Sequence, residues 1–152
     1  MNSAAESSPA AAEVERFARE SIDIADRRTL LSFGRVQNAA LILEKTGLNV
    51  VGFTRILDNY GVRHTLKQHG DPVKEAKRGQ IAVTLEDFGK IGLVTTEPDD
   101  IFSDGTNKIG RQVIVFVKLI DGIGYRHVEE LRGKHKLVAT DSMRKKNGAW
   151  SA

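Results

Sequence analysis

Two histidines and a lysine lie close together in one short stretch of this chain, at His64, Lys67 and His69. The whole chain contains only four histidines and no cysteine. Histidine is the side chain whose ordinary pKa lets it accept or donate a proton near neutral pH. Two imidazoles beside a cation can therefore cleave a phosphodiester without a metal ion. One acts as the base, the other as the acid, and the lysine neutralises the phosphate.

The local sequence predicts that this cluster lies on a helix over residues 59–69. Asp58 is a favourable N-cap residue, and Gly70 is a favourable end because Asp71 and Pro72 follow it. The three candidate groups are therefore expected on a single rigid element.

The spacing within that helix separates the two histidines. Val62 and Leu66 share a face at i,i+4 spacing and His69 follows at i+7, so His69 is expected toward the core as a structural histidine. His64 and Lys67 are expected together on the more exposed side. Spacing alone leaves two interpretations open, a catalytic cluster and an ordinary solvated helix face.

A neighbouring strand would have to supply the remaining groups of a site. Over residues 123–131, alternation places Tyr125, His127 and Glu129 on one face of the strand and Arg126 on the other. Tyr125 and His127 could complete an acid/base site, or they could serve only in cross-strand pairing.

Further polar side chains could hold a phosphate or simply cap the backbone. These are Arg78, Gln80, Thr140 and Ser142. His135 lies in a lysine-rich stretch and is expected to be exposed. Asp99, Asp100 and Asp104 lack the spacing of a calcium loop, so a flexible acidic turn is expected there.

The remaining elements follow from periodicity and turn residues. Helices are predicted over 11–28, 36–45 and 84–91, strands over 49–57, 112–120, 123–131 and 136–140, and a turn over 97–100. Helices that precede an antiparallel meander indicate the α+β class. We therefore expect N-terminal helices packed on an antiparallel sheet of about four strands.

The chain divides into four segments on composition. Residues 1–12 are small and polar and are expected to form a disordered tail or linker, and 13–47 form an N-terminal helical segment. The α+β domain that carries the candidate residues spans 48–142. Residues 143–152 are expected to be a polar tail, in which Trp150 has no assigned role.

Composition excludes several classes of protein. The 152 residues are 40% hydrophobic and 28% charged, as in an ordinary globular protein with one core. The net charge of +3 is compatible with nucleic acid binding without being diagnostic of it. Without cysteine there is no thiolate metal site, and no apolar stretch approaches the ~20 residues that span a bilayer. The chain also lacks a P-loop, a dinucleotide fingerprint and a zinc-protease helix.

Three ordered motifs carry a resemblance to a known family. They read VRHTLKQHG over 62–70, RGQIAVTLEDF over 78–88 and KLVAT over 136–140. In this order and spacing, over roughly 49–142, the chain resembles the phage branch of the barnase, EndoU, tRNA-cutting colicin and RelE-like superfamily. The resemblance implies helices packed on a four-stranded antiparallel sheet. It also implies metal-independent RNA cleavage by the ribose 2′-OH, with a cyclic phosphate product.

The resemblance also implies roles for particular residues. His64 would be the general base or acid, and Lys67 and Arg78 would stabilise the phosphorane-like transition state. His69, Tyr125 and Thr140 would be candidates for the second proton transfer and for positioning. The substrate-binding candidates are Arg63, Gln80, Arg126, His127 and Ser142.

The function expected from the sequence is therefore that of an endoribonuclease, either a toxin or a phage-associated effector, with no cofactor and no metal. Its expected partners are RNA, with tRNA as one candidate, an immunity protein or antitoxin, and a larger phage or toxin polypeptide, but no membrane. It would act in the cytoplasm of a target or host cell, or be delivered with a virion. The alternative is a catalytically silent phage structural domain that binds a capsid partner or nucleic acid. A transferase toxin that uses NAD has no supporting motif.

Overall fold

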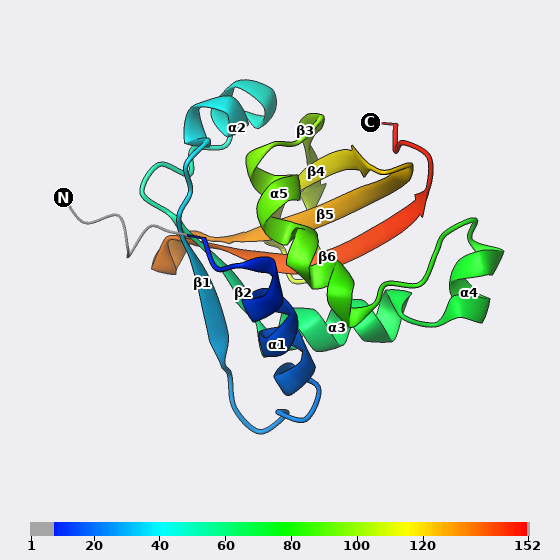
Figure 1. Ribbon diagram of the computed structural model, residues 1–152. Helices are drawn as coiled ribbons and strands as arrows, with labels where there is room; N and C mark the ends of the chain where they lie inside the picture. Colours follow the sequence, from blue (N-terminus) through cyan, green and yellow to red (C-terminus); the bar gives the residue numbers. More distant parts are fainter. Residues whose placement is uncertain (1–7, 152) are drawn as a thin grey trace.

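The computed structural model describes residues 8–151 and contains one mixed six-stranded sheet with helices against it (Figure 1). The strands run β1 Leu30–Arg35, β2 Thr54–Asp58, β3 Asp100–Thr106, β4 Gln112–Ile120, β5 Ile123–Arg132 and β6 Leu137–Asn147. Their order in the sheet is β1-β2-β6-β5-β4-β3. All neighbours are antiparallel except β2 and β6, which are parallel. The α+β class is confirmed, but the prediction of about four antiparallel strands is wrong.

The two strands that the sequence missed, β1 and β3, lie at the edges of the sheet. Both pair on one side only, and both carry the polar residues and glycines that are typical of edge strands. β3 contains Asp100, Asp104 and Gly105, which is why the segment resembled an acidic turn. Such strands form because a partner strand is present, so their own sequence signals them weakly.

Strand β6 continues to Asn147, well beyond the predicted end at Thr140, and replaces most of the expected polar tail. Met143 is buried against the helices, whereas Ser142 and Arg144 lie on the other face. An irregularity in the pairing of β5 with β6 leaves Asp141 as an extra residue between Thr140 and Ser142. Because the bulge interrupts the alternation of polar and buried residues, the sequence pattern did not reveal that the strand continues beyond Thr140.

The end of the chain packs on the sheet, which gives Trp150 a structural place. The Trp150 Nε1 donates a hydrogen bond to the Gly124 carbonyl at 2.9 Å, and the Gly148 amide bonds to the Gly122 carbonyl. A Cβ at position 124 would lie 2.1 Å from the Gly148 carbonyl oxygen, so only glycine allows this close approach.

Helices cover one face of the sheet (Figure 1). They are α1 Ala11–Ser21, α2 Ala39–Thr46, α3 Asn59–His69 and α5 Ile91–Thr96, with the 3-10 helix η2 Leu85–Lys90. Helix α4 Pro72–Lys77 follows α3 and contacts it, and the exposed 3-10 helix η3 Gly133–His135 connects β5 to β6. The predicted N-cap of α3 is confirmed, because the Asp58 carboxylate accepts a hydrogen bond from the Gly61 amide at 2.7 Å. Within residues 8–151 no helix is long and apolar enough to cross a bilayer.

Helix α1 differs from its prediction at both ends. It begins at Ala11, inside the segment expected to be a tail, whereas residues 1–7 of that segment lie outside the described residues. It ends at Ser21 and does not continue to Arg28. The reason is tertiary: the buried Asn59 side chain bonds the carbonyls of Ile24 and Arg27 and thereby holds the segment that follows α1 in a non-helical conformation.

The core lies between the helices and the sheet, and a second, smaller apolar cluster lies on the opposite face. The small cluster consists of Val113, Val115, Val117 and Val128, with Phe102 and Trp150 packed against it. Because no helix within residues 8–151 packs on this cluster, we refer to this side as the open face of the sheet.

We expect Val14→Ala to lower the free energy of unfolding by about 2 kcal/mol, because Val14 is almost completely buried in the main core. Arg16→Ala on the exposed side of the same helix is the matched control and should change stability by less than about 0.5 kcal/mol. Urea titration of both variants measures the difference. Equal stability of the two variants would show that α1 does not dock on the sheet.

Candidate functional site

Helix α3 lies directly beside β6, and this neighbourhood forms the candidate site. β2 pairs with β6 only through Thr54, Arg55 and Ile56, and α3 follows β2 immediately in the chain. The helix then packs alongside the rest of β6. A Cβ at Gly61 would lie 2.6 Å from the Thr140 carbonyl oxygen, so glycine is needed for this close packing. One side of α3 therefore borders the open face.

A pocket of about 750 Å³ lies where α3 meets the open face and the loop between β3 and β4. It is lined by His64, Gln68 and His69 of α3, by Arg78, by Thr106, Asn107, Lys108 and Ile109, and by Glu130, Asp141, Ser142 and Arg144. Two imidazoles and three cations thus outnumber the two carboxylates, Glu130 and Asp141, around one cavity, which favours an anionic substrate.

The pocket brings together four of the residues that the sequence singled out, which are His64, His69, Arg78 and Ser142. The predicted orientations on the helix are confirmed: His69 is buried, whereas His64 and Lys67 are exposed. Lys67 is not part of the pocket lining.

The other sequence candidates lie elsewhere. The Arg63 side chain donates a hydrogen bond to the Ile22 carbonyl, and the backbone N–H of Gln80 donates to the Glu75 carbonyl. The Gln80 side chain does not line the pocket. Arg126 lies on the open face beyond the pocket. Tyr125, His127 and Thr140 are buried on the helix-covered face, so the pocket does not include them.

A buried carboxylate orients His69. The His69 Nδ1 lies 3.2 Å from a Glu75 carboxylate oxygen, and the Glu75 side chain is completely buried. Arg78 donates to the other Glu75 oxygen at 2.5 Å. Burial and the nearby Arg144 charge lower the pKa of His69, although Glu75 opposes this shift. A neutral imidazole with Nδ1 bonded to Glu75 can accept a proton at Nε2 near neutral pH.

Arg144 is the most unusual charge in the pocket. It is half-buried, its Nε atom is buried without a hydrogen-bond partner, and no carboxylate among the described residues forms an ion pair with it. Burial lowers the pKa of Arg144, and the charges of Arg126 and Arg78 lower it further, although the more distant Glu75 carboxylate opposes this shift. A partly desolvated guanidinium without a direct ion pair is costly unless an anion binds to it.

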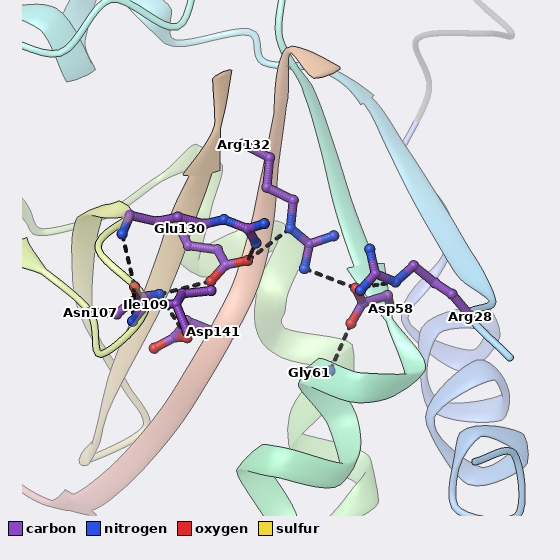
Figure 2. A network of polar contacts seen from close by, with 9 residues as sticks. Arg28, Asp58, Gly61, Asn107, Ile109, Glu130, Arg132 and Asp141 are labelled. Carbon is purple, nitrogen blue, oxygen red and sulfur yellow. Dashed lines mark hydrogen bonds and ion pairs between the residues drawn. The ribbon is translucent and has the colours of Figure 1, made fainter. Parts of the chain in front are cut away.

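The opposite wall of the pocket is held by a network of ion pairs (Figure 2). Glu130 accepts from Arg111 at 2.6 Å, from Arg132 at 2.8 Å and from Asn107 at 2.8 Å, and Arg132 also reaches Asp58 at 3.0 Å. Burial alone would raise the pKa of Glu130, but the two arginines lower it. The network neutralises this carboxylate and fixes the β3–β4 loop against β5.

The buried candidates form a separate cluster beneath the helices. The predicted common face of Tyr125, His127 and Glu129 is confirmed. Glu129 accepts two hydrogen bonds from Arg55, and its other neighbour is the His127 Nε2 at 3.4 Å. The Tyr125 hydroxyl donates to Asp87 at 3.0 Å, and burial together with the Asp87 charge raises the pKa of Tyr125.

Thr140 and Ser142 illustrate how the bulge rearranges the site. Simple alternation would place both hydroxyls on one face, but the extra residue Asp141 separates them. The Thr140 hydroxyl lies 3.5 Å from the His127 Nε2 on the helix-covered face, whereas Ser142 lines the pocket. Asp141 and Ser142 both border the pocket for the same reason.

Sequence reasoning missed several pocket residues. Asn107 and Asp141 lie outside all three motifs, Gln68 lies in the first motif but was assigned no role, and Arg144 fell in the expected tail. Glu75 follows Asp71 and Pro72 on the short helix α4, whose N-cap signal was present in the sequence. No group of three or more metal-ligating side chains is found within residues 8–151.

Comparison with protein families places most of the chain in a known family. A family model described as phage-Barnase-EndoU-ColicinE5/D-RelE like nuclease3 matches residues 34–151, which is more than half of the chain. The match begins within β1 and includes all of β6 and Trp150. Neither a curated protein nor a solved structure matches the chain.

Proposed function

Because the chain belongs to the phage-Barnase-EndoU-ColicinE5/D-RelE like nuclease family, we propose that the pocket beside α3 is the active site of a metal-independent endoribonuclease. One observation carries the proposal: Arg144, a half-buried cation that forms no direct ion pair with the described residues, lines the same cavity as His64 and His69. A phosphate that binds Arg144 would lie in a cavity that also contains both imidazoles.

The two histidines suit complementary proton transfers. The lowered pKa of His69 favours its neutral form, and Glu75 holds its Nδ1, so the free Nε2 would take the proton of the ribose 2′-OH. The 2′ oxygen then forms a bond to phosphorus while the bond to the 5′ oxygen breaks. His64, which is exposed at the mouth of the pocket, would give its proton to that leaving oxygen. The products are a 2′,3′-cyclic phosphate and a free 5′-hydroxyl.

Arg144 and Arg78 would stabilise the negative charge that develops on the phosphorane. Fixed cations directed at developing charge supply a large share of the catalysis in such reactions. The Arg78 side chain is held by Glu75 and by the Gln68 carbonyl, so its position is set before substrate binds. Lys67, Tyr125 and Thr140 have no role in this scheme, and their predicted roles stay predictions.

The biological setting belongs to the same proposal. A phage-associated ribonuclease would act on RNA in a target or host cell as a toxin or effector, and would need an immunity protein or antitoxin in the cell that produces it. The family's description supports the link with phages. The alternative is a silent domain that uses the same cationic pocket to bind nucleic acid without cleaving it.

We expect Arg144→Ala to lower RNA cleavage by about 100-fold, because it removes a charge that acts on the transition state. Its melting temperature should not fall, since no ion pair within the described residues is lost. Arg19→Ala, which removes an exposed arginine on α1, is the matched control and should keep full activity. The assay is cleavage of total RNA in the presence of EDTA, with detection of the cyclic phosphate end.

The same assay separates the two candidate functions. Binding of RNA that depends on Arg144, without cleavage, would establish the silent domain in place of the nuclease. A strict requirement for magnesium, or equal cleavage of DNA, would contradict attack by the 2′-OH.

A further inference from the structure

A row of basic side chains leaves the pocket along the open face of the sheet. Arg126 of β5 lies directly opposite Arg144 of β6, and the next pair on this face joins Gly124 to Lys146. Same-face residues on a strand are about 6.5–7 Å apart. The row Arg144, Arg126 and Lys146 therefore extends the cationic character of the pocket by roughly the length of one extended nucleotide.

The pairing of Arg126 with Arg144 is unfavourable by itself. Like charges directly opposite each other in antiparallel strands destabilise the sheet. Arg126 has one acidic neighbour, the largely exposed Asp104, at 3.3 Å, and Arg144 has no ion pair among residues 8–151. An anion that binds between the two guanidinium groups would remove this repulsion.

Trp150 lies at the far end of the row. Its indole is fixed by the hydrogen bond to the Gly124 carbonyl and by packing against the valines of the open face. The Lys146 Nζ lies 4.8 Å from the centre of the ring, and the Arg126 Cζ lies 6.0 Å from it. An aromatic ring flanked by two long, flexible cations has the composition of a stacking platform for a nucleobase with phosphate contacts on either side.

We propose that Trp150, Arg126 and Lys146 form a subsite for an unpaired nucleotide next to the phosphate held in the pocket, and this rests on the proposed function. The base stacks on the indole. Lys146 and Arg126, which lie over the ring in the free protein, move their charges to the adjoining phosphates. The substrate class is therefore single-stranded RNA.

The geometry favours a single strand over a duplex. A stacking platform requires a base whose face is free, and paired bases in a helix have no free face. Stacking uses the face of the base and makes no hydrogen bond to its edge, so the subsite should bind a nucleotide with any base. The subsite also makes no contact with the sugar, so single-stranded DNA can bind there. DNA is not cleaved, because it has no 2′-OH for the reaction.

Trp150 is the only tryptophan in the chain, so its fluorescence reports on the subsite directly. The probe is a 2′-O-methyl single-stranded oligonucleotide of about eight nucleotides, which cannot be cleaved by 2′-OH attack. We expect the probe to quench Trp150 fluorescence in the intact chain, and the same sequence in a duplex to quench it far less. Equal quenching by the duplex would overturn the selection for single strands.

Variants separate the platform from general charge effects. Trp150→Ala should weaken binding of a labelled probe by roughly 5- to 100-fold in fluorescence polarisation, whereas Trp150→Phe, which keeps an aromatic face, should recover most of the affinity. Lys146→Ala should weaken binding and reduce its salt dependence, whereas Lys134→Ala, at an exposed position in η3, should have little effect. If both tryptophan variants bind like the parent, the subsite does not exist.

The outcome is distinguishable from failure of the proposed function. Quenching without any RNA cleavage would retain the nucleotide subsite and reject the nuclease. Cleavage of RNA without a change in Trp150 fluorescence would retain the nuclease and reject the subsite.

Discussion

We expect His64→Ala to lower RNA cleavage by about 100-fold or more while leaving the melting temperature nearly unchanged. The activity falls because the imidazole that protonates the leaving oxygen is lost. The stability is retained because His64 is exposed and makes no hydrogen bond or ion pair with the described residues. Cleavage rates and thermal melts of the purified variant measure the two effects together.

Two further variants make this result specific. His135→Ala removes an exposed histidine of η3 and should keep full activity, so it controls for loss of an imidazole elsewhere. His69→Ala should lower both activity and stability, because His69 is buried and bonded to Glu75. Full activity of His64→Ala, or loss of its fold, would remove His64 from the proton transfer.

The largest effect on stability is expected for Arg55→Met. Arg55 and Glu129 form a bidentate ion pair at 2.8 and 3.2 Å in which both side chains are almost completely buried. Removing only the arginine leaves a buried carboxylate without its partner, which typically costs about 3–5 kcal/mol. Urea titration of the variant measures this loss in the free energy of unfolding.

The pH dependence of the free energy of unfolding of Arg55→Met tests whether the unpaired Glu129 charge causes the loss of stability. Burial by itself raises the pKa of Glu129, but the Arg55 charge and the hydrogen bonds from His127 and Arg55 lower it from 4.5 to about 2. A lowered folded-state pKa contributes stability above pH 4.5 that is lost as the pH falls toward 2. Without Arg55, burial raises the pKa of Glu129, so the variant should approach the parent in stability as the pH falls.

A double variant and an exposed pair serve as controls. Arg55→Met combined with Glu129→Leu should recover most of the lost stability, because neither buried charge then remains unpaired. Breaking the exposed pair between Arg19 and Glu15 should cost less than about 1 kcal/mol. If Arg55→Met costs no more than the exposed pair, the network is not a major source of stability.

The sequence by itself determined the elements whose signals are local. The N-cap at Asp58 and the helix end at Gly70 depend only on neighbouring residues, and both are present in the structure. Helical spacing also fixed the inward direction of His69 and the outward direction of His64, because the period of a helix is independent of what packs against it.

The tertiary structure decided which of these residues share a site. The bulge at Asp141 moved Thr140 and Ser142 to opposite faces, and the parallel pairing of β2 with β6 placed α3 beside β6. Arg144 reached the pocket only through the pairing of β6 with distant strands, whereas Glu75 reached His69 through the turn between α3 and α4. Pairing register and burial depend on partners far away in the chain. The local sequence pattern therefore identified the histidines as candidates, but it could not predict which other residues line the pocket with them.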